Sequence, residues 1–254
     1  MNIITYNVNG LRAAIAKGLL NWFEQTSPDV VCLQEIKLQP DQLDTEQFAR
    51  LGYHVILHSA ERKGYSGVAL LSKRKPDYVV CGIGEQEFDC EGRVIRADFG
   101  DLTVICVYHP SGSSGAERIA YKMRFHKVWQ RYIQQLALER AQLLICGDFN
   151  IAHQPIDIHD PVRNAKVSGF LPEERAWLTE FLSEGYTDAW RYLNPDLQAY
   201  SWWSYRANAK ASNKGWRIDY CLLSASLLPR LCSARLLSEV AYSDHCPLEV
   251  LLKQ

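Results

Sequence analysis

The sequence has no long apolar run, no paired-cysteine motif and almost no net charge. Polar residues interrupt every hydrophobic segment well short of the about 20 residues that a membrane-spanning helix needs, and we expect no membrane contact. The N-terminal segment turns polar by Asn7, so we expect no signal peptide. The eight cysteines show no CxxC spacing, and several lie in apolar strand-like runs. They indicate reduced thiols in a cytoplasmic protein, and neither a disulfide frame nor a zinc site.

The net charge of −1 excludes a generally basic coat for nucleic acid, but it leaves room for a local basic face. Hydrophobic residues make up 47% of the chain and charged residues 22%, as is typical of a globular protein. No linker or low-complexity tract divides the chain. We therefore expect a single domain over residues 1–254.

Segments rich in Val, Ile and Leu alternate with amphipathic segments. Predicted strands lie at residues 2–8, 29–35, 53–58, 67–72, 94–99, 102–109, 142–148, 217–223 and 247–253. Predicted helices lie at residues 11–26, 40–50, 116–138 and 172–184. Ser114 and Glu117 have capping-box spacing at the start of the third helix, and Pro172 stands in the first turn of the fourth. The pattern indicates sheets with helices packed outside them.

Polar residues stand at the ends of several predicted strands. They are Asn7, Asn9, Gln34, Glu35, Tyr108, Asp148, Asn150, Asp219, Asp244 and His245. Each has an ordinary structural explanation. Asp148 can cap a turn, Glu35 can be a solvated strand end, and His245 can be a core histidine hydrogen-bonded to Asp219. Sheets of α/β proteins build their sites at strand ends, so the whole series favours one convergent site.

The chemistry of this series fits hydrolysis of a phosphoester. Glu35 and Asp244 offer hard carboxylate oxygens, which suit Mg²⁺ or Mn²⁺. If the chain stays extended after Asp148, the side chain of Asn150 points to the same side. With these groups assigned, Asp148 remains as a base that orients and deprotonates water. A carboxylate beside His245 favours the imidazolium, which neutralises phosphate charge.

Eight motifs stand in order along nearly the whole chain: YNVNGLRA, DVVCLQEIK, GYSGVALLSK, VYHPSG, GDFNIAH, SGFLPEERAWL, GWRIDYCLLS and SDHCPLEV. The set resembles the exonuclease III family of abasic-site endonucleases, within the endonuclease/exonuclease/phosphatase superfamily. The resemblance implies an α/β fold, a four-layered sandwich of two packed mixed β-sheets flanked by helices. It also implies base excision repair on duplex DNA. The reactions are metal-dependent hydrolysis of the phosphodiester 5′ to abasic sites and 3′-end processing as exonuclease, phosphodiesterase and phosphatase.

The resemblance also implies roles for individual residues. Glu35 matches the principal metal ligand, with Asn7 and Asp244 close by. Asp148 matches the residue that positions or deprotonates the attacking water, and Asn150 matches a phosphate ligand. His245, held by Asp219, matches a phosphate-contacting histidine. Tyr108 matches a tyrosine near the scissile phosphate and the leaving group.

Residues 206–217 hold basic side chains, Arg206, Lys210 and Lys214 among them, and no acid. Aromatic residues precede and interrupt them, which suits a DNA backbone beside a disrupted base stack, although a solvated loop over core tryptophans gives the same pattern. The resemblance implies that Trp202, Trp216 and Ile218 wall a pocket for a flipped-out, base-free sugar.

The sequence departs from the family at two positions that bear on DNA binding. Ser111 stands where many members carry a longer amide, so a phosphate contact there is weaker or water-mediated. Val167 replaces an Asn found in some members, whereas Asn164 is retained. We expect a monomer acting on duplex DNA with abasic sites or 3′ blocks. The alternatives are a superfamily phosphatase or phosphodiesterase with a non-DNA substrate, and a non-catalytic nucleic-acid-binding relative.

Overall fold

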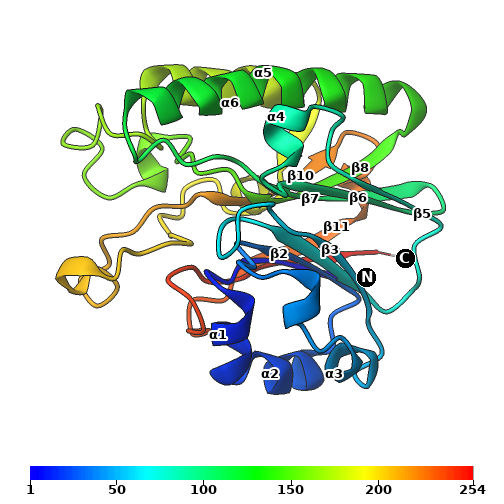
Figure 1. Ribbon diagram of the computed structural model, residues 1–254. Coiled ribbons are helices and arrows are strands. Elements are labelled where there is room, and N and C mark those ends of the chain that lie inside the picture. The colour runs from blue at the N-terminus through cyan, green and yellow to red at the C-terminus, as the bar shows by residue number, and fades with distance from the viewer. Residues whose placement is uncertain (254) are drawn as a thin grey trace.

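The computed structural model describes residues 1–253 and contains two six-stranded sheets (Figure 1). The first sheet has, in spatial order, β11 (Leu231–Leu236), β12 (Leu248–Leu252), β1 (Asn2–Asn7), β2 (Val30–Gln34), β4 (Val68–Ser72) and β3 (His54–His58). The second has β5 (Tyr78–Cys81), β6 (Val94–Phe99), β7 (Leu102–Tyr108), β8 (Gln142–Asp148), β10 (Asp219–Ser224) and β9 (Tyr186–Asp188). Both sheets are mixed, because β1 runs parallel to β2 and β7 parallel to β8 among antiparallel neighbours.

Helices cover the outer face of each sheet (Figure 1). On the first sheet lie α1 (Leu11–Ala16), α2 (Leu19–Thr26) and α3 (Glu46–Ala49). On the second lie α5 (Ala116–Glu139) and α6 (Pro172–Ser183). The remaining short elements are α4 (Gln86–Asp89), α7 (Ala189–Leu193) and the 3₁₀ turns Pro40–Gln42, Pro155–Asp157, Arg206–Asn208 and Leu228–Arg230.

Each interface between layers has its own hydrophobic core. One core lies between the two sheets and includes Val104 and Leu144. A second packs α5 and α6 on the second sheet, and a third packs α1, α2 and α3 on the first. Every residue of β7 is buried, which explains why this strand reads as an unbroken apolar run in the sequence. The predicted four-layered α/β sandwich is confirmed.

All nine predicted strands are present, but two predicted helices are wrong in extent. The predicted helix 11–26 is broken into α1 and α2 at Gly18, whose φ of 106° is outside the helical range. The predicted helix 40–50 contains only a 3₁₀ turn and the four-residue α3. Pro172 does begin α6, as predicted.

The capping box predicted for α5 is wrong. Gly115, and not Ser114, is the N-cap of α5, and no side chain caps the helix. Three strands of the structure, β5, β9 and β11, were not predicted from the sequence. β5 is largely exposed, β9 has three residues, and β11 is an edge strand with mixed burial.

Among residues 1–253, no helix is long and apolar enough to cross a membrane. The predicted domain ends at Gln254, which lies outside the described residues.

Candidate active site

The ends of five strands meet at one edge of the sandwich. β1 and β2 are parallel partners, so Asn7 and Glu35 leave the first sheet side by side. β7 and β8 are parallel partners in the second sheet, with Tyr108 in register with Asp148. Asp219, the first residue of β10, also pairs in register with Asp148. The predicted convergence of strand ends thus brings together residues from both sheets.

Asn7 joins the two sheets through its side-chain amide. The amide nitrogen donates to Glu35 Oε1 over 2.9 Å and to Asp148 Oδ2 over 2.8 Å. Asn7 is fully buried, and its amide oxygen accepts the backbone N–H of Asn9 over 3.0 Å. A buried amide with both ends satisfied holds these two carboxylates at a fixed separation.

The chain turns directly after Asp148. Asp148 Oδ1 accepts the backbone N–H of Asn150 over 2.8 Å, and Asn150 has a φ of 52°. The chain therefore does not stay extended after Asp148, and the side chain of Asp148 does cap a turn. The Asn150 amide still lies beside Asp148, with Nδ2 3.4 Å from Oδ2, and its main donation is to the carbonyl oxygen of His109.

His245 lies between two buried carboxylates. Its Nδ1 is 2.9 Å from Asp219 Oδ2, and its Nε2 is 3.9 Å from Asp148 Oδ2. Burial lowers the pKa of His245, but Asp219 and Asp148 outweigh it and raise the pKa to about 10. Burial and the charge of Asp219 raise the pKa of Asp148 to about 7, against the lowering effect of His245 and Asn7. The imidazolium is the stable form at neutral pH, as the sequence predicted.

Glu35 is paired with Lys37. Glu35 Oε2 lies 2.8 Å from Lys37 Nζ, which also donates to Asn9 Oδ1. Burial raises the pKa of Glu35, but Lys37 and the Asn7 amide outweigh it, and the pKa lies below the usual range. Asn9, Glu35, Lys37 and Asn150 all have φ between 45° and 52°. Such backbone is rare for Glu and Lys and concentrates at functional sites.

Asp244 lies at the other side of the same cluster. Its Oδ1 accepts the Asn9 amide over 2.9 Å, and its Oδ2 accepts the indole N–H of Trp202 over 3.0 Å. Burial raises the pKa of Asp244, but His245, Trp202 and Asn9 bring it below the usual range.

The cluster has the donor set and the charge that a divalent cation requires. Ligand atoms of Glu35, Asp148 and His245 all lie within 4.8 Å of one another. The site contains two cations, Lys37 and His245, and four carboxylates, which are those of Glu35, Asp148, Asp219 and Asp244. Excess negative charge in a poorly solvated site is relieved by a bound cation.

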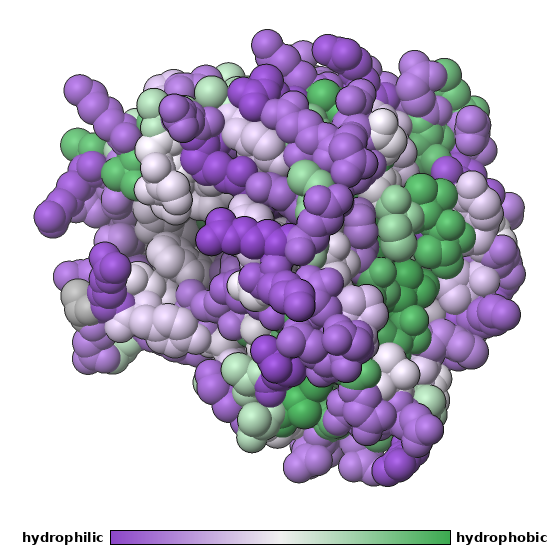
Figure 2. All heavy atoms as spheres, viewed as in Figure 1, coloured by the Kyte–Doolittle hydropathy of each residue, from purple (hydrophilic) through white to green (hydrophobic). Residues whose placement is uncertain are grey.

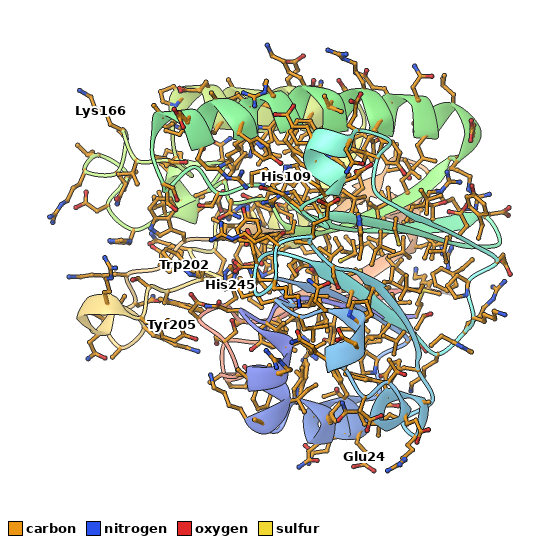
Figure 3. The ribbon with its side chains drawn as sticks, in the orientation of Figure 1. Glu24, His109, Lys166, Trp202, Tyr205 and His245 are labelled. Carbon is orange, nitrogen blue, oxygen red and sulfur yellow. The ribbon has the colours of Figure 1, made fainter. Side chains whose placement is uncertain are left out.

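A pocket of about 380 Å³ opens over this cluster. Nine predicted site residues line it: Glu35, Tyr108, Ser111, Asn150, Trp202, Trp216, Ile218, Asp244 and His245. Two long loops, residues 158–171 before α6 and residues 194–218 before β10, project on either side of it, and Figure 2 shows the surface hollowed between them on the left. In Figure 3, Trp202 and His245 lie together at this edge, with Lys166 on one loop and Tyr205 on the other.

Trp202 and Trp216 form the apolar part of the lining. Their rings meet edge to face with centroids 6.0 Å apart, and their backbones pair with each other. Gly169 packs against the ring of Trp216, where an added Cβ would lie 2.7 Å from Cζ3. Ile218 is part of the small hydrophobic cluster behind both tryptophans.

A buried ion pair supports the loop behind the pocket. Lys122 from α5 donates to Glu174 of α6 over 2.7 Å and to the carbonyl oxygen of Asn150 over 2.8 Å. Glu174 Oε2 accepts the backbone N–H of Gly169 over 2.6 Å. The outer helices therefore fix both the turn after β8 and the loop under Trp216.

The predicted basic loop is only partly a surface feature. Arg206, Lys210 and Lys214 are exposed beside the pocket, and Lys210 lies over the Trp203 ring. Arg217 is 1% exposed and ion-paired with Asp157 and Asp188, so it does not belong to the basic surface. The Asn164 amide donates to backbone carbonyls of its own loop and does not line the pocket.

Further residues to which the sequence reasoning gave no role also belong to the site. Asn9 and Lys37 hold Asp244 and Glu35, and Ser168 lines the pocket. The motifs YNVNG and LQEIK place Asn9 and Lys37 two residues after Asn7 and Glu35, which is the signal that points to them. Nothing in the sequence distinguishes Ser168 from other loop serines.

The fold is shared with a known family. A model of the Endonuclease/Exonuclease/phosphatase family matches residues 4–245, and the chain belongs to this family. It is 43% identical over 254 residues to an exodeoxyribonuclease of Bacillus subtilis (strain 168), with 99% of each chain covered.

Two solved structures are similar over the whole of both chains. A 3′ phosphatase from Neisseria bound to a product DNA hairpin superposes with a TM-score of 0.94 at 28% identity. An AP endonuclease from Archaeoglobus fulgidus superposes with a TM-score of 0.92 at 30% identity. These findings confirm the predicted family and the prediction of a DNA repair nuclease.

Proposed function

We propose that the protein hydrolyses the phosphodiester 5′ to abasic sites in duplex DNA and processes blocked 3′ ends. One observation carries the proposal: a pocket walled by two tryptophans opens onto the half-buried carboxylates of Glu35 and Asp244 and the buried ring of His245. The similar proteins support it, because they are by name an exodeoxyribonuclease, a 3′ phosphatase and an AP endonuclease. We further propose that residues 1–254 act as one domain, as a monomer, in the cytoplasm.

Each side chain of the site has a role in hydrolysis that follows from its charge and position. Asp148 orients a water molecule and takes its proton. The imidazolium of His245 donates from Nε2 to a phosphate oxygen, while Asp219 on Nδ1 fixes its orientation. The amide of Asn150 holds a second phosphate oxygen, and the hydroxyl of Tyr108 lies beside the leaving group. Asn7 keeps the carboxylates of Asp148 and Glu35 apart.

Glu35 would hold Mg²⁺ or Mn²⁺, with Asn7 and Asp244 close by. When bound, the cation polarises the phosphate and stabilises negative charge on the leaving oxygen. Lys37 partly neutralises Glu35 in this structure and contacts Asn9, so it keeps the carboxylate ionised. The donor set contains oxygen ligands and one imidazole, which suits a hard cation better than zinc bound by thiolates.

Substrate choice depends on the pocket and the two loops. Trp202, Trp216 and Ile218 present apolar surface that fits a base-free sugar and rejects an intact nucleotide by shape. Arg206, Lys210 and Lys214 contact backbone phosphates from one loop, and Asn164 lies on the opposite loop. Ser111 reaches the pocket with a short hydroxyl and contacts phosphate directly or through water.

The test uses a duplex with a single abasic analogue, assayed with Mg²⁺ and with excess chelator. We expect cleavage on the 5′ side of the analogue with Mg²⁺ or Mn²⁺ and none with chelator. Glu35→Ala should raise the metal concentration required and lower the rate severely. Full cleavage in excess chelator would overturn the metal mechanism.

The same assay separates the alternatives. Hydrolysis of a phosphomonoester outside DNA, with the duplex left intact, would favour the superfamily phosphatase. Duplex binding without any hydrolysis would favour a non-catalytic relative, although Glu35, Asp148 and His245 are all in place.

A further inference from the structure

Arg93 contacts Tyr108 at three points. Its carbonyl oxygen accepts the backbone N–H of Tyr108 over 2.9 Å, and its Nη1 donates to the carbonyl oxygen of Tyr108 over 2.9 Å. Its guanidinium carbon also lies 4.8 Å from the centroid of the Tyr108 ring, within the range of a cation–π contact. One side chain therefore fixes both the main chain and the ring of Tyr108.

Arg93 is itself buried and restrained. It is 2% exposed, its Nε donates to Glu91 over 2.7 Å, and its Nη2 donates to the Tyr65 hydroxyl over 3.2 Å. Arg118 from α5 donates to both of these partners as well. A guanidinium in this position cannot reach a DNA phosphate without leaving its partners, so its influence is exerted within the protein.

The hydroxyl of Tyr108 is the part of the residue that needs this support. Tyr108 ends β7, is 8% exposed and lines the pocket with Glu35 and Asn150. A phenol hydroxyl is a hydrogen-bond donor, and the strength of its hydrogen bond depends on its direction.

We propose that Arg93 is a positioning residue that holds the ring of Tyr108 so that its hydroxyl is directed at the reacting phosphodiester. The kinetic part of this inference rests on the proposed function, whereas the structural part does not. Without Arg93, the ring keeps its apolar contacts but loses the cation on its face and the hydrogen bond to its carbonyl oxygen.

Arg96 provides a matched control on β6. It also pairs with an acid two residues away, Asp98, at 2.6 Å, and its guanidinium carbon lies 5.3 Å from the Tyr78 ring. Tyr78 is 56% exposed on the edge strand β5 and does not line the pocket.

The kinetic test compares Arg93→Met with Arg96→Met on the abasic duplex. Arg93→Met should lower kcat by about 10- to 100-fold, the scale of a misplaced catalytic group, and change KM little. Arg96→Met should leave both constants unchanged. Arg93→Lys, which keeps the cation beside Glu91, should recover part of kcat, and it replaces Arg93→Met if that variant does not fold.

A double-mutant cycle asks whether Arg93 acts through Tyr108. In a Tyr108→Phe background, Arg93→Met should cause no further loss of kcat, because the hydroxyl that it positions is gone. An equal loss in both backgrounds would overturn the proposal and leave Arg93 as a stabilising residue only.

The second readout needs no activity. In protein labelled with ¹³C at the tyrosine phenol carbon, the Tyr108 signal is the one that Tyr108→Phe removes. Arg93→Met should shift this signal, and Arg96→Met should not. An unshifted signal would overturn the proposal. If the protein cut no DNA under any condition, the proposed function would fail while this measurement still decided the role of Arg93.

Discussion

At the residue scale, Asp148 combines a structural contact with the proposed chemistry. One of its oxygens accepts the backbone N–H of Asn150 and so closes the turn after β8. The other accepts the Asn7 amide and faces His245. The sequence posed these two explanations as alternatives, but a carboxylate has two oxygens and can serve both.

Asp148→Asn should separate hydrolysis from binding. The amide keeps the shape of the side chain and removes the basic oxygen, so turnover should fall by about 10² or more. Affinity for the abasic duplex should persist or rise, because repulsion between the carboxylate and the phosphate is lost. The measurement is single-turnover cleavage beside a binding titration. Cleavage near the native rate would leave the turn cap as the only role of Asp148.

Residue identities at the site could be predicted from the sequence better than their contacts. Asp219 and His245 were expected to meet, and they do, at 2.9 Å. The partners of Glu35 were not foreseen, because Lys37 and Asn9 reach the carboxylates only through backbone of positive φ. Neither the hydrophobic periodicity of a sequence nor its residue propensities predict a turn with positive φ at a non-glycine residue.

At the element scale, the pocket wall is formed by short irregular segments and not by regular strands. Trp216 pairs with Trp202 and Ile158 through isolated bridges, and its ring packs on Gly169. Aromatic composition indicated the tryptophans, whereas the loop opposite them could not be predicted, since its position depends on the distant Lys122–Glu174 pair.

Trp216→Ala should weaken selection and leave hydrolysis in place. Lost packing against a flipped sugar is worth about 1–3 kcal/mol, so cleavage at the abasic analogue should fall accordingly. The wider pocket should reject an intact 3′-terminal nucleotide less. The measurement is the ratio of the two cleavage rates, with Trp216→Phe as the conservative comparison and thermal melting as the check on folding. A well-folded variant with an unchanged ratio would place the pocket elsewhere.

The basic loop is the second element that permits a direct test. Lys210 and Lys214 are exposed on it, in a chain of net charge −1. Affinity for duplex DNA should fall with salt, and Lys210→Ala with Lys214→Ala should flatten that dependence, because fewer phosphates are neutralised. The control variant, Lys127→Ala with Arg131→Ala, removes the same charge from the exposed face of α5. It should leave the salt dependence unchanged. Equal slopes for both pairs would remove the loop from the DNA footprint.

At the scale of the whole molecule, the sandwich was predictable because strands buried on both faces are continuous apolar runs. The edge strands β5 and β11 were not predictable, because a strand that is exposed on one side is not a continuous apolar run. The pairing of two sheets was not written in any local pattern either. The pairing of the sheets was inferred from the resemblance that eight ordered motifs carry. This pairing alone brings Asn7 of one sheet to Asp148 of the other.

Between the second sheet and its covering helices lies a buried layer of aromatic and histidine rings. His126 stacks on Trp177 with centroids 3.9 Å apart, and His109 stacks on Phe149 at 4.2 Å. Both histidines are fully buried, and within residues 1–253 none of their ring nitrogens has a hydrogen-bond partner. Burial lowers the pKa of both well below the usual range, so they are neutral in the folded protein.

This layer should make the protein sensitive to acid. Below about pH 6.5 the unfolded chain binds protons at these histidines and the folded chain does not, so stability falls as the pH falls. The loss is up to about 1.4 kcal/mol per pH unit for each histidine. His126→Phe keeps an aromatic ring on Trp177 and removes one titrating group. Its free energy of unfolding, from urea titrations at pH 7, 6 and 5, should therefore decline less steeply than that of the native protein. His54→Phe, on the exposed side of β3, is the control and should follow the native curve. Parallel curves for all three proteins would mean that the His126 ring gains a proton as readily in the folded state, and the acid sensitivity would have to arise at other groups.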